Sequence, residues 1–568
     1  MGSKRVILLY NQSNTFGLSQ DAALIENFLQ KSLQKFEITR MDPLQPPVNA
    51  DIVIHLEVPH PVWFQWAPTQ IWMVNPEWCS PNWFPYKDSF TQIWVKEQSR
   101  VAEFGSKAVH VPWAVRGPLK PVEPTALGLR QALWVLGASE NKHTAARALL
   151  PLWPADFPLT VTTALEVDKD LSGSFPPSVT VKRGFLEAAE LESLNTSSAI
   201  HVCISAAEGF GFTAAQAEAR SAGLLLNTLP VYKEYYGDKP YAAFLETPTV
   251  KSSKDHCGYV ADFSKVTTEA IREALLNLVP SGEAEVLVSE GRYETFSSCL
   301  ETNITSLLRN AKPHVAKPPI LDVADCPPIS VLTLTYNRRN FVELAFLNLL
   351  KTDYPLSKIQ WVVVEDSDDP MKSVSDKIKG FEEAVKETGL EVTYVPMATK
   401  RSIGHKRNLA VKAAKHEICV NMDDDDFYPT TSFRRRVAWL RSSLKNGVVG
   451  CTMIAMYDLQ LGISAVNTPP WALKQCERVS EASFCFYKRY ALAFPFPDVQ
   501  QSEGEGFVHP DSFLEIPPQQ ILVALNHGTN TSGRVIAGKA QTGCFWGWDQ
   551  KFLTWLHGLV GVQVEAEK

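Results

Sequence analysis

Short apolar segments rich in β-branched residues alternate with segments of helical periodicity along most of this chain. In the C-terminal part, a helical segment at 341–350 lies among strand-like segments at 329–335, 359–364 and 418–422. The N-terminal part has strand-like segments at 6–10, 52–56, 71–74, 93–95, 132–137, 179–181 and 199–204. This alternation restricts the fold to the α/β class and predicts mainly parallel sheets.

A proline-rich segment divides the chain. Residues 311–328 contain five prolines and no periodic apolar pattern, as is typical of a semi-rigid linker. One hydrophobic core stops growing near roughly 250–300 residues, so a chain of 568 residues needs more than one domain. We expect an N-terminal module at 1–310, with Rossmann-like halves at about 1–120 and 121–310, and a C-terminal module at 329–568.

Composition excludes several classes of protein. The formal net charge of −7 argues against nucleic acid or an anionic membrane as the main partner. No run of about 18 apolar residues predicts a membrane span, and the apolar run at 6–10 is too short for a signal peptide. The ten cysteines include no C-x-x-C pair, which disfavours a zinc site and fits free thiols in a reducing compartment. These observations together predict a cytoplasmic protein.

The run Asp423–Asp426 directly follows the strand-like segment at 418–422. In open α/β sheets, ligands bind at the carboxyl ends of the strands. Adjacent carboxylates repel one another, and a divalent cation such as Mn²⁺ or Mg²⁺ relieves that repulsion. The run therefore predicts a metal site, with a solvated acidic turn as the alternative. Strand alternation makes Asp423 and Asp425 the working pair, turns Asp424 away and leaves Asp426 in support.

Other polar segments accompany this run in a definite order. The first C-terminal strand ends in Thr335-Tyr336-Asn337-Arg338, and the second ends in Glu365-Asp366. Lys406 and Arg407 lie in a basic turn that enters a helix shortly before the aspartates. A Lys-Arg pair in this position is suited to hold a diphosphate.

The order Thr-Tyr-Asn-Arg, Glu-Asp-Ser, Gly-x-x-Arg-Asn and Asp-x-Asp resembles family 2 glycosyltransferases of the GT-A fold, over residues 329–530. The resemblance implies a metal-dependent transferase that acts with inversion on a nucleotide sugar, with a UDP-sugar favoured. The donor-binding residues that it implies are Thr335, Tyr336, Asn337, Arg338, Glu365, Asp366, Lys406, Arg407, Asp423 and Asp424. It also implies that Asp423, Asp425 and the late His527 hold the metal.

A glycine-rich turn at 502–507 supplies two further carboxylates, Glu503 and Glu505. An inverting transferase needs one carboxylate to accept the proton of the attacking hydroxyl. The family usually has a Glu-Asp pair in this turn, whereas this chain has Gly504 after Glu503. Both glutamates are therefore candidate bases, and Glu503 is favoured.

In the N-terminal part, a glycine-rich turn at 203–212 follows a strand and enters a helix, which makes an anion site. The turn resembles that of family 4-like glycosyltransferases of the GT-B fold. That resemblance implies donor-binding residues Lys142, Ser205, Glu208, Gly209, Phe210, Gly211 and Glu218, and acceptor residues Asn14, Gly17 and Glu77. In the family the second glutamate lies eight positions after the first, whereas Glu218 lies ten positions after Glu208.

The favoured interpretation is a bifunctional glycosyltransferase that moves sugars from nucleotide-sugar donors to a glycan or glycoconjugate acceptor. One alternative is an active C-terminal transferase with a non-catalytic N-terminal module that binds a glycan or acceptor. A nucleotidyl or phosphoryl transferase also uses an Asp-bound metal, but the chain has no P-loop. A non-catalytic glycan-binding protein is the remaining class, and the intact aspartate run disfavours it for the C-terminal part.

Overall fold

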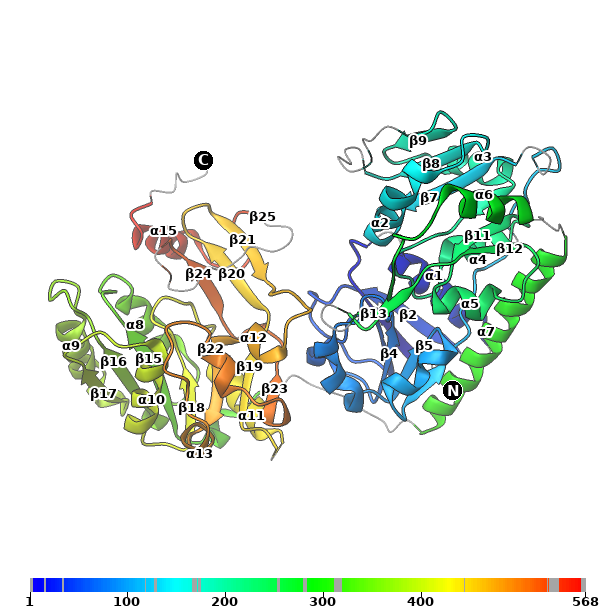
Figure 1. The fold of residues 1–568 in the computed structure, drawn as a ribbon. Coiled ribbons are helices and arrows are strands. Elements are labelled where there is room, and N and C mark those ends of the chain that lie inside the picture. Colours follow the sequence, from blue (N-terminus) through cyan, green and yellow to red (C-terminus); the bar gives the residue numbers. More distant parts are fainter. Residues whose placement is uncertain are drawn as a thin grey trace. The chain divides into compact units, whose positions relative to one another are not determined.

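The computed structural model describes residues 4–14, 17–32, 35–117, 119–126, 130–165, 171, 175–252, 256–278, 283–310, 319–443, 445–528, 530 and 541–562. The chain forms two compact units, Met1–Val315 and Ala316–Lys568 (Figure 1). The part of the predicted linker at 311–318 lies outside the described residues.

The first half of the N-terminal unit is a six-stranded parallel sheet with strand order β2-β1-β3-β4-β5-β6. Its strands are β1 (Lys4–Leu9), β2 (Phe36–Met41), β3 (Ile52–Leu56), β4 (Thr69–Val74), β5 (Gln92–Val95) and β6 (Ala108–His110). Helix α1 (Gly17–Lys31) connects the first two strands and buries Leu18, Ile25 and Phe28 among its apolar residues. The connections between β3 and β6 contain the 3-10 helices η1 (Pro61–Trp63), η2 (Pro81–Ser89) and η3 (Gln98–Phe104).

The second half is another six-stranded parallel sheet, with order β12-β11-β10-β7-β8-β9. Its strands are β7 (Ala132–Gly137), β8 (Leu159–Thr163), β9 (Val179–Arg183), β10 (Ile200–Val202), β11 (Gly223–Asn227) and β12 (Ala242–Leu245). The accompanying elements are α2 (Glu140–Leu149), η4 (Leu150–Leu152), α3 (Ala188–Ser197), α4 (Phe212–Glu218), α5 (Pro230–Tyr236), α6 (Thr268–Asn277) and the antiparallel pair β13 (Thr249–Lys251) and β14 (Tyr259–Ala261).

The long helix α7 (Glu283–Asn310) returns the chain to the first half. Its residues Phe296, Leu300 and Ile304 are buried in the same apolar cluster as β1, β3 and β4. Residues Phe210 and Ala215 of the second half also belong to that cluster. The two halves therefore share part of their core.

The C-terminal unit contains a seven-stranded mixed sheet with order β17-β16-β15-β18-β22-β19-β23. The strands are β15 (Ile329–Thr335), β16 (Ile359–Glu365), β17 (Glu391–Pro396), β18 (Ile418–Asn421), β19 (Val448–Cys451), β22 (Ser480–Tyr487) and β23 (Phe513–Glu515). Strands β15, β16, β17 and β18 are parallel to one another, and β22 is antiparallel to both β18 and β19.

A second, four-stranded sheet in this unit has the order β24-β20-β21-β25. It consists of β20 (Ile454–Asp458), β21 (Ile463–Asn467), β24 (Val523–Asn526) and β25 (Gln541–Thr542). The helices of the unit are η6 (Val323–Asp325), α8 (Val342–Lys351), η7 (Leu356–Lys358), α9 (Ser375–Val385), η8 (Lys386–Thr388), α10 (Ile403–Ala413), α11 (Ser432–Arg441), α12 (Gln475–Arg478), α13 (Lys488–Ala493), α14 (Gly504–Phe507), η9 (Pro510–Ser512) and α15 (Gln550–Gly558).

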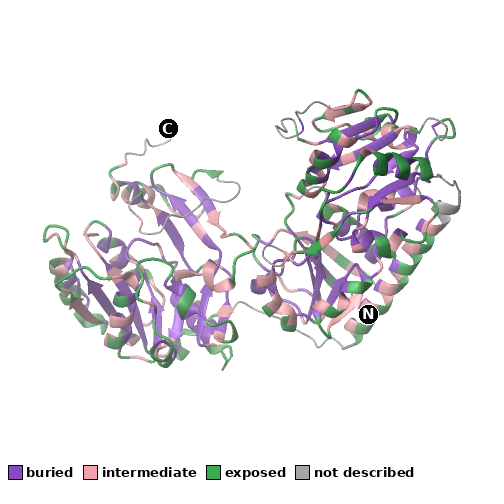
Figure 2. Ribbon diagram, in the orientation of Figure 1, coloured by how far each residue is buried: buried purple, intermediate pink, exposed green. Residues whose placement is uncertain are grey.

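The predicted α/β class is confirmed. Figure 2 shows buried strands inside each unit and helices whose outer faces are exposed. The predicted segments 52–56, 132–137 and 329–335 coincide with β3, β7 and β15. The strand predicted at 418–422 ends one residue earlier, at Asn421.

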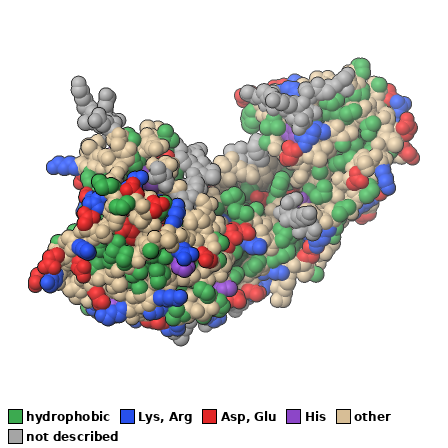
Figure 3. Space-filling model, turned by 60° about the vertical axis from the view of Figure 1, so that its left-hand side comes forward, with side chains coloured by type: hydrophobic (Ala, Val, Ile, Leu, Met, Phe, Trp, Pro, Cys, Tyr) green, Lys and Arg blue, Asp and Glu red, His purple; other side chains and the backbone are tan. Residues whose placement is uncertain are grey.

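The surface carries charges of both signs. On the face drawn in Figure 3, Lys and Arg side chains alternate with Asp and Glu side chains instead of forming one stripe. Among the described residues, every helix is too short or too polar to cross a bilayer.

Candidate active site

The C-terminal ends of β15 and β18 border a cavity of about 740 Å³ in the C-terminal unit. Because the two strands are neighbours and parallel, their carboxyl ends lie at the same edge of the sheet. The predicted residues that line this cavity are Thr335, Tyr336, Asn337, Arg338, Lys406, Arg407, Asp423, Asp424, Asp425, Glu503 and Glu505. The tertiary fold therefore brings together segments that are separated by more than a hundred residues in sequence.

Three carboxylates of the aspartate run are close enough to share a cation. One oxygen from each of Asp423, Asp425 and Asp426 lies within 4.8 Å of the others. Local hydrogen bonds hold the run in place: the backbone N–H of Asp423 donates to the Tyr428 hydroxyl at 2.9 Å, and Asp426 accepts from the backbone N–H of Leu525 at 3.0 Å. This carboxylate set is the arrangement that hard divalent cations prefer.

Asp424 is not in the set of carboxylates that could share a cation, but its side chain does not turn away from the cavity. Arg338 Nη1 donates to Asp424 at 3.0 Å and also contacts Asp425, so all three side chains meet in the cavity. The reason is that β18 ends at Asn421, and residues 424 and 425 form a turn to which strand alternation does not apply. Burial raises the pKa of Asp424 to about 6, although Arg338 opposes the shift.

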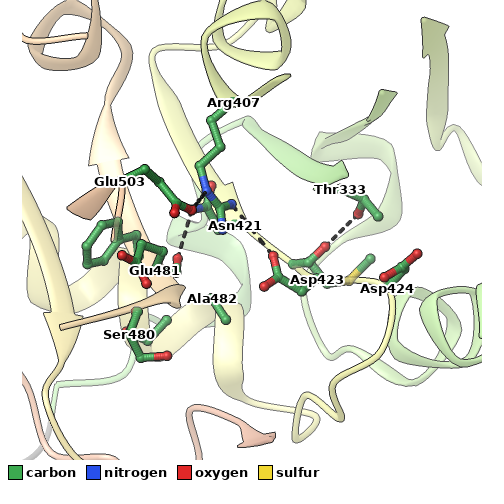
Figure 4. A network of polar contacts seen from close by, with 12 residues as sticks. Thr333, Arg407, Asn421, Asp423, Asp424, Ser480, Glu481, Ala482 and Glu503 are labelled. Carbon is green, nitrogen blue, oxygen red and sulfur yellow. Dashed lines mark hydrogen bonds and ion pairs between the residues drawn. The ribbon is translucent and has the colours of Figure 1, made fainter. Parts of the chain in front are cut away.

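Both residues of the basic pair have carboxylate partners. Lys406 Nζ lies 2.7 Å from Asp366 Oδ1, and both side chains are almost fully buried. Arg407 Nε donates to Glu503 at 2.7 Å, and its Nη1 lies 3.6 Å from Asp423 (Figure 4). Burial alone lowers the pKa of Arg407, but Asp423 and Glu503 outweigh it and raise that pKa. Arg407 thus connects the aspartate run to Glu503.

The predicted donor residues at the ends of β15 and β16 divide into two groups. Tyr336 and Asn337 line the cavity and both hydrogen-bond to Asp368, at 2.8 and 2.7 Å. Glu365 and Asp366 do not line it. Glu365 accepts from the Tyr394 hydroxyl at 2.5 Å and from the backbone N–H of Val374 at 2.9 Å, so it orders the loop beside the cavity.

His527 follows β24 and approaches the aspartate run from the second sheet. Its Nε2 lies 2.9 Å from Asp425 Oδ2, and its ring packs on Phe341 with 4.5 Å between the ring centroids. The residue is buried and is not part of the cavity lining. It therefore contacts the proposed metal ligands through Asp425.

The two glutamates of the 502–507 turn differ in their surroundings. Glu503 is 4% exposed and pairs with Arg407, whereas Glu505 is exposed. Two further glutamates line the cavity and were not predicted from the sequence, Glu477 of α12 and Glu481 of β22. Glu481 lies beside Gly504. Its only signal is an acidic residue at the start of an apolar strand, and that signal does not reveal which distant segment the residue faces.

The N-terminal unit has a cavity of its own, of about 760 Å³. Residues of both halves line it. The predicted residues among them are Asn14, Gly17, Glu77, Lys142, Glu208, Phe210 and Gly211. Glu77 is 8% exposed and its Oε2 has no hydrogen-bond partner among the described residues. Burial and the nearby Glu208 raise the pKa of Glu77 to about 8.

Three predicted residues of the N-terminal turn lie outside that lining. The Ser205 hydroxyl donates to the Ala207 carbonyl at 2.7 Å. A Cβ atom at Gly209 would lie 2.2 Å from Glu77 Oε2, so the carboxylate needs a glycine there. Glu218 binds the Tyr241 hydroxyl at 2.5 Å and Arg292 at 3.1 Å. Helix α4 lines the cavity with Phe212, Thr213 and Gln216, and Gln216 is the residue eight positions after Glu208.

The sequence of the C-terminal unit is similar to that of a known protein family. Residues 330–485 match the family described as Glycosyl transferase family 2. No curated protein matches the chain. Solved structures with similarity include the mannosyltransferase PcManGT from Pyrobaculum calidifontis in complex with GDP-Man and Mn²⁺, at 21% identity and a TM-score of 0.29, over 40% of this chain and 64% of that chain.

Another similar structure is S. aureus TarS 1-349 in complex with UDP-GlcNAc, at 19% identity and a TM-score of 0.27, over 36% of this chain and 61% of that one. The matches thus span less than two thirds of either solved chain. The match at 330–485 covers β15 to β22, and with them the aspartate run and the basic pair. By sequence, the C-terminal unit is therefore similar to glycosyltransferase family 2 over residues 330–485.

Proposed function

We propose that the C-terminal unit transfers a sugar, with inversion, from a nucleotide-sugar donor to a hydroxyl of a glycan or glycoconjugate. The observation that carries this proposal is the convergence of Asp423, Asp425 and Arg338 with Lys406 and Arg407 at one cavity, inside the segment that matches the family. A UDP-sugar is the favoured donor. The cavity of about 740 Å³ falls in the range of small-molecule sites.

The aspartate run fits a divalent cation, Mn²⁺ or Mg²⁺. Asp423 and Asp425 would hold it, with Asp426 as a third carboxylate and His527 beside Asp425. When bound, such an ion neutralises charge that develops on the departing diphosphate. The Oδ1 atom of Asp424 pairs with Arg338, while its Oδ2 atom is buried and has no hydrogen-bond partner among the described residues.

The cationic residues have separate roles in this proposal. Arg338 lies between Asp424 and Asp425 and lines the cavity, so it is placed to meet a diphosphate oxygen beside the aspartates. Arg407 contacts both Asp423 and Glu503 and so fixes these two carboxylates relative to each other. Lys406 is largely compensated by Asp366. A carboxylate of the cavity accepts the proton of the attacking hydroxyl, and the candidates predicted from the sequence are Glu503 and Glu505.

The test is a screen of nucleotide sugars with the full chain, with and without Mn²⁺ or Mg²⁺. We expect turnover of at least one donor that requires a divalent cation. The Asp425→Asn variant should lose that turnover while remaining folded at the assay temperature, as its melting curve would show. Cation-independent turnover, or full activity of Asp425→Asn, would refute the metal role, and cleavage of the donor between its phosphates would indicate a phosphoryl transferase instead.

We further propose that the N-terminal unit is a GT-B-like module with a second nucleotide-sugar site, which would make the chain bifunctional. The cavity between its halves supports this, because Glu77, Lys142 and Glu208 converge there from both halves. The alternative is a non-catalytic module that binds the acceptor. In full-length Asp425→Asn, residual transfer that Glu208→Ala then removes would support two active sites. Acceptor binding without residual transfer would support the alternative.

A further inference from the structure

We propose that Glu481 is the general base of the C-terminal site and that Glu503 is a positioning residue. This assignment rests on the proposed transferase function and concerns the same cavity. Glu481 lies at the start of β22, the strand next to β18, and it lines the cavity together with the aspartate run. Figure 4 shows Glu481 beside Glu503, near the guanidinium of Arg407.

The carboxylate of Glu481 occupies the space that a side chain at residue 504 would fill. The backbone N–H of Gly504 donates to Glu481 Oε1 at 2.9 Å. A Cβ atom built on Gly504 would lie 2.7 Å from that same oxygen. A Glu-Asp pair in the turn would place its second carboxylate at residue 504. In this chain, β22 delivers a carboxylate to that place instead.

The carboxylate of Glu503 is held by a buried arginine. Its Oε1 accepts from Arg407 Nε at 2.7 Å, and the two side chains are 5% and 6% exposed. This charge-assisted hydrogen bond fixes the Glu503 carboxylate against Arg407, which is the role of a positioning residue. By contrast, Glu481 has no ion pair among the described residues, and its carboxylate accepts from backbone N–H groups, those of Gly504 and of Glu481 itself.

The reaction step follows from this placement. The acceptor hydroxyl gives its proton to the Glu481 carboxylate as its oxygen forms a bond to the anomeric carbon. The bond between that carbon and the phosphate oxygen breaks, and its electron pair leaves with the nucleoside diphosphate. No oxidant or further reactant is needed, and Glu481 then returns the proton to solvent.

The electrostatic surroundings of Glu481 agree with this role. Burial of the carboxyl and the charge of Glu503 raise the pKa of Glu481 to about 7, while Arg407 opposes the shift. Glu503 faces it from the N-terminus of α14, and Arg407 faces it from α10. A base with a pKa close to the working pH is the most efficient one.

The first experiment compares Glu481→Gln with wild type and with the control Glu382→Gln, an exposed position on α9. General-base catalysis contributes roughly 10²–10⁴-fold, so kcat should fall by that factor in Glu481→Gln. The donor KM and the affinity for UDP or GDP should stay within about twofold. The acid limb of the kcat/KM pH profile should disappear in this variant and persist in Glu503→Gln.

A second experiment moves the carboxylate. Gly504→Asp is introduced together with Glu481→Ala and Val479→Ala, because Val479 Cγ2 would also lie 2.7 Å from the new Cβ atom. Recovery of at least about tenfold in kcat over Glu481→Ala/Val479→Ala, with the acid limb restored, would support the assignment. Melting temperatures show that each variant is folded.

The results separate the two proposals. A wild-type chain that is active, with Glu481→Gln within about threefold of its kcat, overturns the assignment of the base and leaves the transferase function intact. Loss of the acid limb in Glu503→Gln, with the limb kept in Glu481→Gln, makes Glu503 the base. A wild-type chain that turns over no nucleotide sugar overturns both proposals.

Discussion

Replacing Lys406 by methionine should destabilise the C-terminal unit by about 3–5 kcal/mol, because it breaks a buried ion pair and leaves one charge without its partner. The Lys406 side chain is 6% exposed and that of Asp366 is 0% exposed, with 2.7 Å between Nζ and Oδ1. After the substitution, the backbone N–H of Arg401, at 2.8 Å, is the remaining described donor to Asp366. One backbone hydrogen bond offsets little of the cost of burying a carboxylate.

The chain offers a matched control. Lys415 and Glu391 also lie 2.7 Å apart in the same unit, but their side chains are 60% and 47% exposed. An exposed pair of this kind contributes roughly 0–1 kcal/mol. Lys415→Met should therefore leave the stability of the unit nearly unchanged. Because both ion pairs have the same N···O distance, the difference between the two variants measures the effect of burial.

Scanning calorimetry of the full chain measures the effect. For a unit of this size, each kcal/mol shifts the melting temperature by roughly 2–4 °C, so Lys406→Met should lower one transition by about 6–20 °C. The double variant Lys406→Met/Asp366→Asn should recover part of that loss. A loss below about 1 kcal/mol in Lys406→Met, or a loss equal to that of Lys415→Met, would refute the reasoning from burial.

Three other predictions follow from single sites. Asp425→Asn should lower the cation-dependent rate by at least about 100-fold, since a bound cation is worth several kcal/mol at a developing charge; an unchanged response in a Mn²⁺ titration would contradict this. Gly404→Ala should destabilise the C-terminal unit by at least about 1–3 kcal/mol, because its Cβ would lie 1.8 Å from the Pro497 carbonyl oxygen. The control is Gly380→Ala, because nothing lies within 4 Å of the Cβ atom that it adds. This variant should stabilise α9 by about 0.5–1 kcal/mol. Equal melting temperatures of Gly404→Ala and Gly380→Ala would contradict the packing argument. The folded-state pKa of Glu77 is raised from 4.5 to about 8, so the native N-terminal unit binds an extra proton between these pH values. Its stability should therefore fall as the pH rises through this window, by up to about 1.4 kcal/mol per pH unit, and calorimetry should find a flatter pH dependence in Glu77→Gln.

Local periodicity in the sequence was enough to predict the α/β class and most of the strands that border the cavities. The end of β15 and the aspartate run after β18 were identifiable because strand ends are marked by a change from apolar to polar residues within a few positions. Parallel strands gather such ends at one edge of a sheet. The pattern therefore placed the end of β15 and the aspartate run at one edge, while the donor-binding role of Arg338 was implied by the family resemblance.

Only the tertiary structure decided which charges meet. The pairs Lys406–Asp366 and Arg407–Glu503 join segments 40 and 96 residues apart, and no local pattern encodes such partners. The placement of Asp424 depended on a turn that begins after β18. In the N-terminal unit, Gln216 lines the cavity eight residues after Glu208. Glu481 could not be identified from the sequence for the same reason: it meets Gly504 of α14, 23 residues further along the chain, only in the folded unit.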